Sequence, residues 1–379
     1  MNAGFGVYIH WPFCQAKCPY CDFNSHVWRE VDQAVWTDAL VRELMHLREL
    51  SGPQPAETIF FGGGTPSLMA PGTVETLIEA VDRLWGLVHT PEITLEANPT
   101  SVEAAKFAGY ASAGVNRVSI GVQALNDQDL KALGRLHSAA EARHAVETAR
   151  ATFDRISFDL IYARMGQSLG AWEDELSEAL SFAADHLSLY QLTIEEGTRF
   201  AELHARGRLH VLEDGLQAEM YELTQAMTEA AGLPAYEVSN HAQPGAESQN
   251  NLIYWRGGAW AGAGPGAHGR LGLAEGRVGT ETIRDPAAWL KAVETEGHGL
   301  LPVEPLTPDD TATEYLLMSL RLREGACLDH FAHLNGAPLP PSRINPLAQL
   351  GLLETRDKRI AATPKGRLVL NAILGELLA

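Results

Sequence analysis

Short apolar runs alternate with longer amphipathic stretches along the first half of the chain. The runs are rich in β-branched, aromatic and aliphatic residues and are bounded by glycine, proline or polar residues, a pattern that is typical of strands. They predict strands at residues 6–11, 58–61, 92–96, 117–121, 156–162 and 187–193. Strands that alternate with helices form a parallel sheet. Because six such units are too few for a closed eight-stranded barrel, we predict an α/β fold with a partial (β/α)6 barrel.

The stretches between these strands predict helices, for example over residues 31–50 and 73–85. In the first of them Leu40, Leu44 and Leu47 recur at helical spacing. Folds of this class carry their chemistry at the C-terminal ends of the strands. Polar and glycine residues that directly follow a predicted strand are therefore the candidates for a functional site.

The pattern changes in the second half of the chain. A helix is predicted over residues 218–231, a strand over AYEVSN at 235–240, and a glycine-rich segment over 251–269. We therefore predict that the partial barrel occupies residues 1–235 and that a glycine-rich extension occupies residues 236–304.

A third part is predicted at the C-terminus. Pro302, Pro305 and Pro308 indicate a linker, and residues 309–322 beyond them predict a helix. The sequence GLLETRDKRIAATPKG predicts a β-hairpin wing before a final helix. Together these features predict a winged-helix-like domain over residues 305–379.

Composition and charge restrict the classes of protein that fit. The chain has 379 residues, of which 45% are hydrophobic and 20% charged, as in a globular protein with a sizeable core. Its net charge of −19 argues against a nucleic-acid partner, because surfaces that bind phosphates are normally basic. No apolar run is long enough for a transmembrane helix, and the start MNAGFGVYIHWPFC does not resemble a signal peptide. We therefore expect a cytoplasmic protein.

Three of the four cysteines lie close together. Cys14, Cys18 and Cys21 have C-x3-C-x2-C spacing, whereas Cys327 is distant and is predicted to be an apolar core residue. Three thiolates can bind three irons of a 4Fe–4S cluster, which leaves the fourth iron open to a small molecule. The alternative is a zinc site in which His10 or His26 supplies the fourth ligand.

The segment YIHWPFCQAKCPYCDFNS resembles the cluster loop of the radical S-adenosylmethionine superfamily. More narrowly, it is similar to the family that contains the oxygen-independent coproporphyrinogen III oxidases and the heme chaperones called HemW. The resemblance covers nearly the whole chain. It implies a 4Fe–4S cluster on the three clustered cysteines. It also implies that S-adenosylmethionine binds the fourth iron and can be cleaved to a 5′-deoxyadenosyl radical.

The same resemblance assigns residues to the cosubstrate. Gly63, Gly64 and Thr65 follow a predicted strand, and glycine allows a ligand to approach the backbone closely. In the family this loop binds the methionyl amine. The resemblance gives further contacts to Tyr8, Glu96, Gln123, Arg135 and Asp159. Taken singly, each of these could instead be an ordinary hydrogen-bonding residue at the end of a strand.

Two departures favour the chaperones over the oxidases. The oxidases carry a fourth cysteine two residues after the third, where this chain has Phe23. They also carry a long N-terminal arm, which this chain is expected to lack because Tyr8 stands so close to its start. The resemblance therefore predicts a heme chaperone. The oxidase, which decarboxylates coproporphyrinogen III, another radical enzyme, and a zinc-binding structural protein remain as alternatives.

The chaperones also carry a His-Asn-x-x-Tyr-Trp motif that serves heme binding. This chain has NNLIYW, in which Asn251, Tyr254 and Trp255 match but Asn250 replaces the histidine. An amide is a poor iron ligand beside imidazole. The substitute ligands are His241, His268, Tyr254 and Cys327.

The resemblance implies heme, an electron donor and a heme-accepting protein such as a respiratory enzyme as partners. A homodimer and peripheral contact with membrane proteins are compatible with it. The cluster could serve radical chemistry, or it could serve docking and dimerisation.

Overall fold

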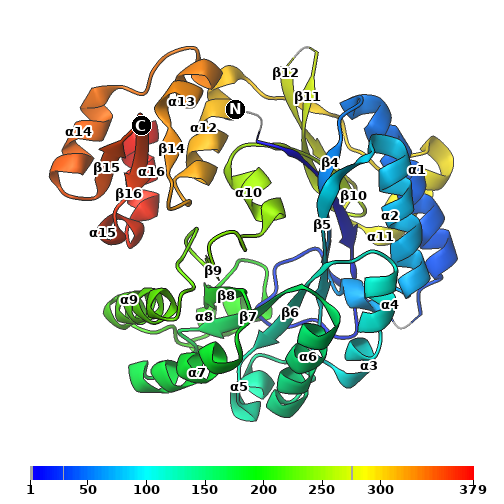
Figure 1. The fold of residues 1–379 in the computed structure, drawn as a ribbon, viewed down its shortest axis with the longest axis horizontal. Coiled ribbons are helices and arrows are strands. Elements are labelled where there is room, and N and C mark those ends of the chain that lie inside the picture. Colours follow the sequence, from blue (N-terminus) through cyan, green and yellow to red (C-terminus); the bar gives the residue numbers. More distant parts are fainter. Residues whose placement is uncertain (1–2, 29, 275) are drawn as a thin grey trace.

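The computed structural model describes residues 3–28, 30–274 and 276–379, and its centre is a curved sheet with helices along the outer face (Figure 1). Six parallel strands form the middle of this sheet and match the six predicted strands. They are β1 (Phe5–Trp11), β4 (Ala56–Gly63), β5 (Leu87–Ala97), β6 (Arg117–Gln123), β7 (Arg155–Tyr162) and β8 (His186–Gln191). The prediction of a partial barrel is therefore confirmed.

The extension adds strands to both edges of the same sheet. On one edge β10 (Ala259–Ala263) runs parallel to β1, and β11 (His268–Leu273), β12 (Gly276–Glu281) and β13 (Glu304–Pro305) continue it as antiparallel strands. On the other edge β9 (Asn240–Ala242) pairs antiparallel with β8. Residues 236–304 thus share the sheet of the barrel, and part of the predicted proline linker forms β13.

The strand predicted over residues 235–240 is wrong. Only an isolated bridge from Ala235 to His241 and the start of β9 at Asn240 are extended there. Between them the chain turns, because the carboxylate of Glu237 accepts hydrogen bonds from the backbone N–H of Ser239 and the side chain of Asn240, both at 2.7 Å. These hydrogen bonds to the Glu237 side chain compete with strand pairing and outweigh the strand propensity of the segment.

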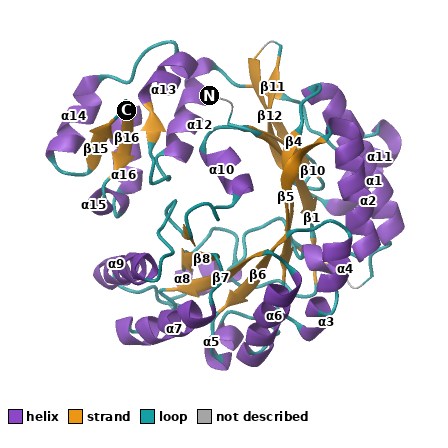
Figure 2. Ribbon diagram, viewed as in Figure 1, coloured by secondary structure: helices purple, strands orange, loops and turns teal. Residues whose placement is uncertain are grey.

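The helices cover the convex face of the sheet (Figure 2). The longer ones are α1 (Gln33–Ser51), α2 (Pro71–Trp85), α6 (Ala139–Thr152), α7 (Leu169–Phe182), α9 (Asp214–Ala230) and α11 (Pro286–Glu296). Shorter helices are α3 (Ser101–Ala104), α4 (Phe107–Ser112), α5 (Asp127–Ala132) and α8 (Arg199–Ala205). Among the described residues, no helix combines the length and apolar composition needed to cross a bilayer.

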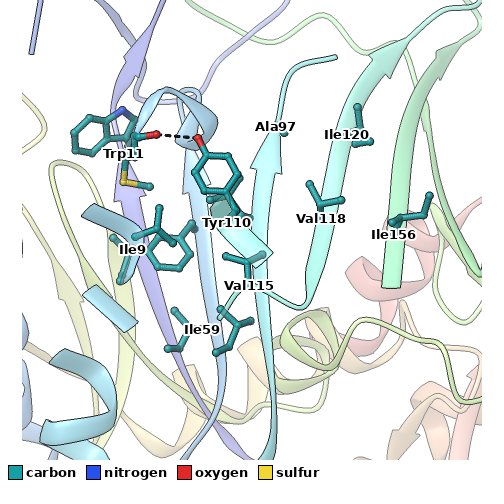
Figure 3. Packing of buried hydrophobic residues seen from close by; sticks show 14 of the residues in the cluster. Ile9, Trp11, Ile59, Ala97, Tyr110, Val115, Val118, Ile120 and Ile156 are labelled. Atoms are coloured by element: carbon teal, nitrogen blue, oxygen red, sulfur yellow. Dashed lines mark hydrogen bonds between the residues drawn. The ribbon is translucent and has the colours of Figure 1, made fainter. Parts of the chain in front are cut away.

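Strand alternation separates an apolar outer layer from a polar interior. On β1 the side chains of Val7, Ile9 and Trp11 are buried in the main hydrophobic cluster, and those of Tyr8 and His10 point the other way. Figure 3 shows Ile9, Ile59, Ala97 and Val118 of four neighbouring strands packed with Tyr110 and Val115. The hydroxyl of Tyr110 donates to the carbonyl of Met69 at 2.8 Å, so its polar group is satisfied within this layer.

Helix α10 (Gln249–Trp255) contains the NNLIYW motif and lies within the curve of the sheet (Figure 1). It contacts β1, β4 and β10 on one side and α12 (Pro308–Ser319) on the other. Trp255 stacks under the guanidinium of Arg321 at 4.7 Å, and Arg256 pairs with Glu324 at 3.0 Å. The motif helix therefore joins the barrel to the C-terminal unit.

The C-terminal unit has its own hydrophobic core and the predicted winged-helix-like order. After α12 come β14 (Ala326–Cys327), α13 (Leu328–Asn335), α14 (Pro341–Gln349), β15 (Leu353–Arg356), β16 (Arg359–Ala362), α15 (Pro364–Arg367) and α16 (Leu370–Leu378). Asp357 and Lys358, at the tip of the wing, have φ of 48° and 64°. Positive φ at both residues of a two-residue loop is the type I′ turn that suits the twist of a hairpin.

One buried carboxylate connects three separate segments. Glu43 of α1 accepts hydrogen bonds from the backbone N–H of Gly264 at 2.6 Å, the indole of Trp289 at 2.9 Å and the backbone N–H of Gly299 at 2.9 Å. All three donors are buried away from water. If the carboxylate were removed, each would be left without a hydrogen-bond acceptor.

We expect Glu43→Gln to lower the free energy of unfolding by about 1–3 kcal/mol, because the amide NH2 would face an N–H group and leave one buried donor unpaired. Denaturant unfolding measures the change. Glu79→Gln, at an exposed position of α2, is the control and should leave the stability unchanged. Equal stability of the two variants would contradict this account of Glu43.

Candidate metal and cofactor site

The three clustered cysteines lie above the C-terminal ends of the barrel strands. Cys14 ends the short strand β2 (Phe13–Cys14), and Cys18 and Cys21 follow in the loop that leads to β3 (His26–Val27). All three thiols line one cavity. The same cavity is lined by seven of the residues assigned to the cosubstrate: Gly63, Gly64, Thr65, Glu96, Gln123, Arg135 and Asp159. The structure thus brings together residues that are spread over the first half of the chain.

Each thiol has a polar neighbour suited to a thiolate. The hydroxyl of Thr65 donates to Cys14 Sγ at 3.4 Å, the guanidinium of Arg135 approaches Cys18 Sγ at 3.5 Å, and Ser25 Oγ lies 3.9 Å from Cys21 Sγ. Burial raises the pKa of the Cys14 and Cys21 thiols. A metal that binds thiolates would reverse this effect.

This donor set fits a group that takes three thiolates. The four cysteines are free, and three of them share the cavity. Both histidines considered for a zinc site are hydrogen-bonded elsewhere. His10 lies between Tyr8 and the backbone carbonyl of Asn24, and His26 contacts the side chain of Asn24. Among the described residues, no three His, Cys, Asp or Glu side chains converge closely enough for a single metal ion.

The Gly63–Gly64 turn packs closely against the end of β1 and the residues that follow it. Gly63 has φ of 111°, and a Cβ there would meet the ring of His10 at 2.7 Å. A Cβ on Gly64 would meet the backbone of Pro12 and Phe13 at 2.8 Å. The N–H groups of Gly64 and Thr65 donate to the carbonyls of Trp11 and Phe13. Glycine is therefore required here for close packing of two loops, whatever ligand the turn binds.

Two carboxyl groups face the cavity from neighbouring regions of the sheet. Burial raises the pKa of Glu96 to about 8, with a further contribution from the charge of Asp159. Burial likewise raises the pKa of Asp159 to about 6, although hydrogen bonds from Ser188 and Ser119 oppose the shift. A cation bound beside these carboxyl groups would stabilise their ionised forms and lower their pKa values.

Arg135 and Gln123 are held in defined conformations. Arg135 donates to the side chain of Asn98 at 2.6 Å and to the carbonyl of Gly121 at 2.8 Å. Gln123 has φ of 73°, and the pairing of β6 with β7 shifts register just before it. Backbone strain of this kind is concentrated at functional sites.

Some cavity residues were not predicted, and one predicted residue lies elsewhere. Asn98, Tyr20 and Ser119 line the cavity. The signal for Asn98 was its place in TLEANP, directly after the end of β5. Tyr8 is not among the residues that line the cavity, and its hydroxyl instead donates to His10 Nδ1 at 2.8 Å.

The residues considered for heme do not lie in this cavity and do not form one cluster. Asn250 is 1% exposed and accepts from Thr58 at 3.1 Å. His241 on β9 is fully buried beside Gln225 of α9. His268 on β11 has a side chain that is 58% exposed, with Glu281 3.9 Å away.

The remaining motif residues have different neighbours. The amide of Asn251 contacts the hydroxyl of Tyr236 at 3.4 Å, and the ring of Tyr254 lies 4.6 Å from that of Trp260. Trp255 contacts Arg321, as described above. Cys327 is half-buried in the C-terminal unit.

Comparisons with known proteins agree with this architecture. The sequence profile of the radical SAM superfamily matches residues 8–178, and that of the HemN C-terminal domain matches residues 306–369. The solved structure of coproporphyrinogen III oxidase (HemN) from Escherichia coli superposes with a TM-score of 0.82 at 20% identity, covering 99% of this chain and 90% of that one. That likeness shows a shared fold.

Relatives of known name align over almost the whole chain. The heme chaperone HemW of Escherichia coli (strain K12) is 37% identical over 98% of each chain, and that of Bacillus subtilis (strain 168) is 34% identical, also over 98% of each. Radical S-adenosyl methionine domain-containing protein 1, mitochondrial, of Bos taurus is 39% identical over 98% of this chain and 87% of its own. The chain therefore belongs to the HemW family within the radical SAM superfamily.

Proposed function

We propose that the protein is a heme chaperone that binds heme and transfers it to acceptor proteins, and that it carries a 4Fe–4S cluster which binds S-adenosylmethionine. The observation that carries the heme part is the near full-length similarity to two bacterial proteins named heme chaperones. The cofactor part is supported by the cavity that three thiols, the Gly63–Gly64 turn and two carboxyl groups share.

The residues of the cavity have separable roles in this proposal. Cys14, Cys18 and Cys21 would hold the cluster as thiolates, and a reduced cluster supplies one electron for cleavage of the cosubstrate. Arg135 favours the thiolate of Cys18, and Thr65 donates to that of Cys14. Glu96 and Asp159 present carboxyl groups to the positively charged cosubstrate.

The second candidate is an oxygen-independent coproporphyrinogen III oxidase, which is favoured by the likeness of fold to HemN. Against it stands Phe23, which is 58% exposed and lines the cavity at the position of the oxidases' fourth cysteine. An apolar ring cannot bind iron. Anaerobic incubation with coproporphyrinogen III, S-adenosylmethionine and a reductant tests this alternative, and formation of protoporphyrinogen would support it.

His268 is the heme ligand that the geometry favours. Asn250 and His241 are buried and hydrogen-bonded, so neither could reach an iron without local unfolding. The imidazole of His268 is largely exposed. The indole of Trp260 donates to the carbonyl of His268 at 2.9 Å and packs against Tyr254. An exposed imidazole on a strand whose backbone is bonded to one of two packed aromatic residues suits a flat macrocycle.

We expect heme to bind the reconstituted protein and to co-elute with it in gel filtration as a stoichiometric Soret band. His268→Ala should weaken heme binding by roughly tenfold or more, equivalent to at least about 1.4 kcal/mol, and should alter the band. His241→Ala is the matched control and should retain the affinity. Failure of the unmodified protein to bind heme would contradict the chaperone proposal, whereas unchanged binding by His268→Ala would contradict the ligand only.

We expect the affinity for S-adenosylmethionine to rise between about pH 6 and pH 8 and then to level off. The pKa values of Asp159 and Glu96 are raised to about 6 and about 8, so at lower pH the cationic cosubstrate must displace protons. For one linked proton the gain is at most about tenfold per pH unit. Calorimetry under anaerobic conditions measures both affinity and proton release.

Glu96→Gln cannot ionise and should lose the upper part of this pH dependence. Glu79→Gln, on the outer surface of α2, should keep it. An affinity that is flat across this range in the unmodified protein would contradict the role given to the two carboxyl groups.

A further inference from the structure

Asn24 connects the cysteine loop to the extension, far away in sequence. Its Nδ2 donates to the backbone carbonyls of Pro265 and Arg284, both at 2.8 Å. A carbonyl can only accept, so the NH2 group must be the side of the amide that faces them. Its Oδ1 lies 3.2 Å from Nε2 of His26. One short side chain thus bridges three segments.

The backbone of Asn24 is held from the barrel side as well. Its carbonyl accepts from His10 Nε2 at 2.9 Å, which makes Nε2 the protonated ring nitrogen. His10 Nδ1 then accepts from the hydroxyl of Tyr8 at 2.8 Å. This chain of hydrogen bonds runs from the barrel interior to the cysteine loop. It gives Tyr8 and His10 a structural role beside the cavity.

The loop between β10 and β11 is built to receive this side chain. Gly266 has φ of 75°, and a Cβ there would meet Asn24 Nδ2 at 2.5 Å. A Cβ on Gly264 would meet the carbonyl oxygen of His10 at 2.3 Å. The loop is itself held by Glu43, which accepts from the N–H of Gly264, and by Thr282, whose hydroxyl donates to the carbonyl of Gly264 at 2.5 Å.

The three cysteines are held by different parts of the molecule. Cys14 lies on β2, where Thr65 contacts it, and Cys18 is contacted by Arg135. The segment that follows Cys21 is joined to the extension by Asn24. The position of Cys21 therefore depends on a loop that begins more than two hundred residues later in the sequence.

We propose that Asn24 is a positioning residue that holds the Cys21 end of the cluster loop on the β10–β11 loop and thereby slows loss of the cluster. This inference rests on the proposed cluster. It adds that the extension supports the cluster loop from outside the cavity, whose lining comes from the barrel.

The test compares Asn24→Asp with Asn116→Asp. Each substitution keeps the shape of the side chain and removes the donors to backbone carbonyls. Asn116 makes comparable bonds, to the carbonyl of Pro91 at 2.8 Å and from the N–H of Ile93 at 2.9 Å, next to the N-terminal end of β6. After anaerobic reconstitution, the loss of cluster absorbance is followed with an iron chelator. The spectrum of the reduced cluster is recorded by electron paramagnetic resonance with and without S-adenosylmethionine.

We expect the cluster of Asn24→Asp to be lost about tenfold faster or more, because two hydrogen bonds are removed. Its resonance spectrum should also change, whereas Asn116→Asp should match the unmodified protein in both measurements. Gly266→Ala reaches the same contact from the other side and should reproduce the faster loss, which provides a second variant if Asn24→Asp folds poorly. Unchanged cluster loss in Asn24→Asp or in Gly266→Ala would overturn the proposal.

A failure of the proposed cluster binding, on which this inference rests, would look different. The unmodified protein would then retain no cluster, and hydrogen exchange of residues 15–25 in the cluster-free protein becomes the measurement. Faster exchange in Asn24→Asp than in Asn116→Asp supports the positioning role, and equal exchange overturns it.

Discussion

The parallel pairing of β1 with β4 is the contact on which the cavity depends. It pairs Ile9 with Phe61 and Trp11 with Gly63, so the cysteine loop leaves β1 beside the turn that leaves β4. Because the faces of a strand alternate, a slip by one residue would bring Ile9 inward and His10 outward. The apolar outer layer that contains Ile9 and Phe61 excludes that slip. Hydrophobic packing on one face of the sheet thereby determines the chemistry on the other.

The buried carboxyl groups inside the barrel cost the protein stability when no ligand is bound. Glu96 and Asp159 are buried carboxyl groups whose raised pKa values mean that burial and their mutual repulsion disfavour ionisation. Arg135 offsets part of this repulsion, since its charge lowers the pKa of Asp159, although it is also turned toward Cys18. The site contains two acids, three thiols and one cation, Arg135, that is shared between them. A cationic ligand and a metal cluster would stabilise such a site more than further packing would. This argues for a binding role and against a structural one.

The sequence predicted most of what depends on local pattern. Six strands were found because each carries buried apolar residues, whereas the cavity residues were assigned by the resemblance to the radical S-adenosylmethionine superfamily. Strand β10 was not predicted, since AWAGA lacks β-branched residues and becomes a strand only by pairing with β1. The strand over residues 235–240 was predicted wrongly because the side chain of Glu237 redirects the backbone.

Other features depended on contacts that no local pattern carries. Glu43 was not predicted as a buried residue, although it lies on the same helix face as Leu40, Leu44 and Leu47. Its hydrogen-bond partners are more than two hundred residues away. The NNLIYW motif was identified by its resemblance to a family motif. Its burial against β4 and its contact with Arg321 are tertiary contacts, which the six residues alone do not predict.

The extension can support the cysteine loop for a topological reason. Because β10 is parallel to β1, the turn after β10 emerges at the same edge of the sheet as the cysteine loop after β1. Glycine at the positions of Gly264 and Gly266 then lets two loops meet without side chains between them. The named relatives align over 98% of the chain and not over the barrel alone. Support of the cysteine loop by β10 and its turn accounts for that extent, since a barrel without them would leave Asn24 and the carbonyl of His10 without these contacts.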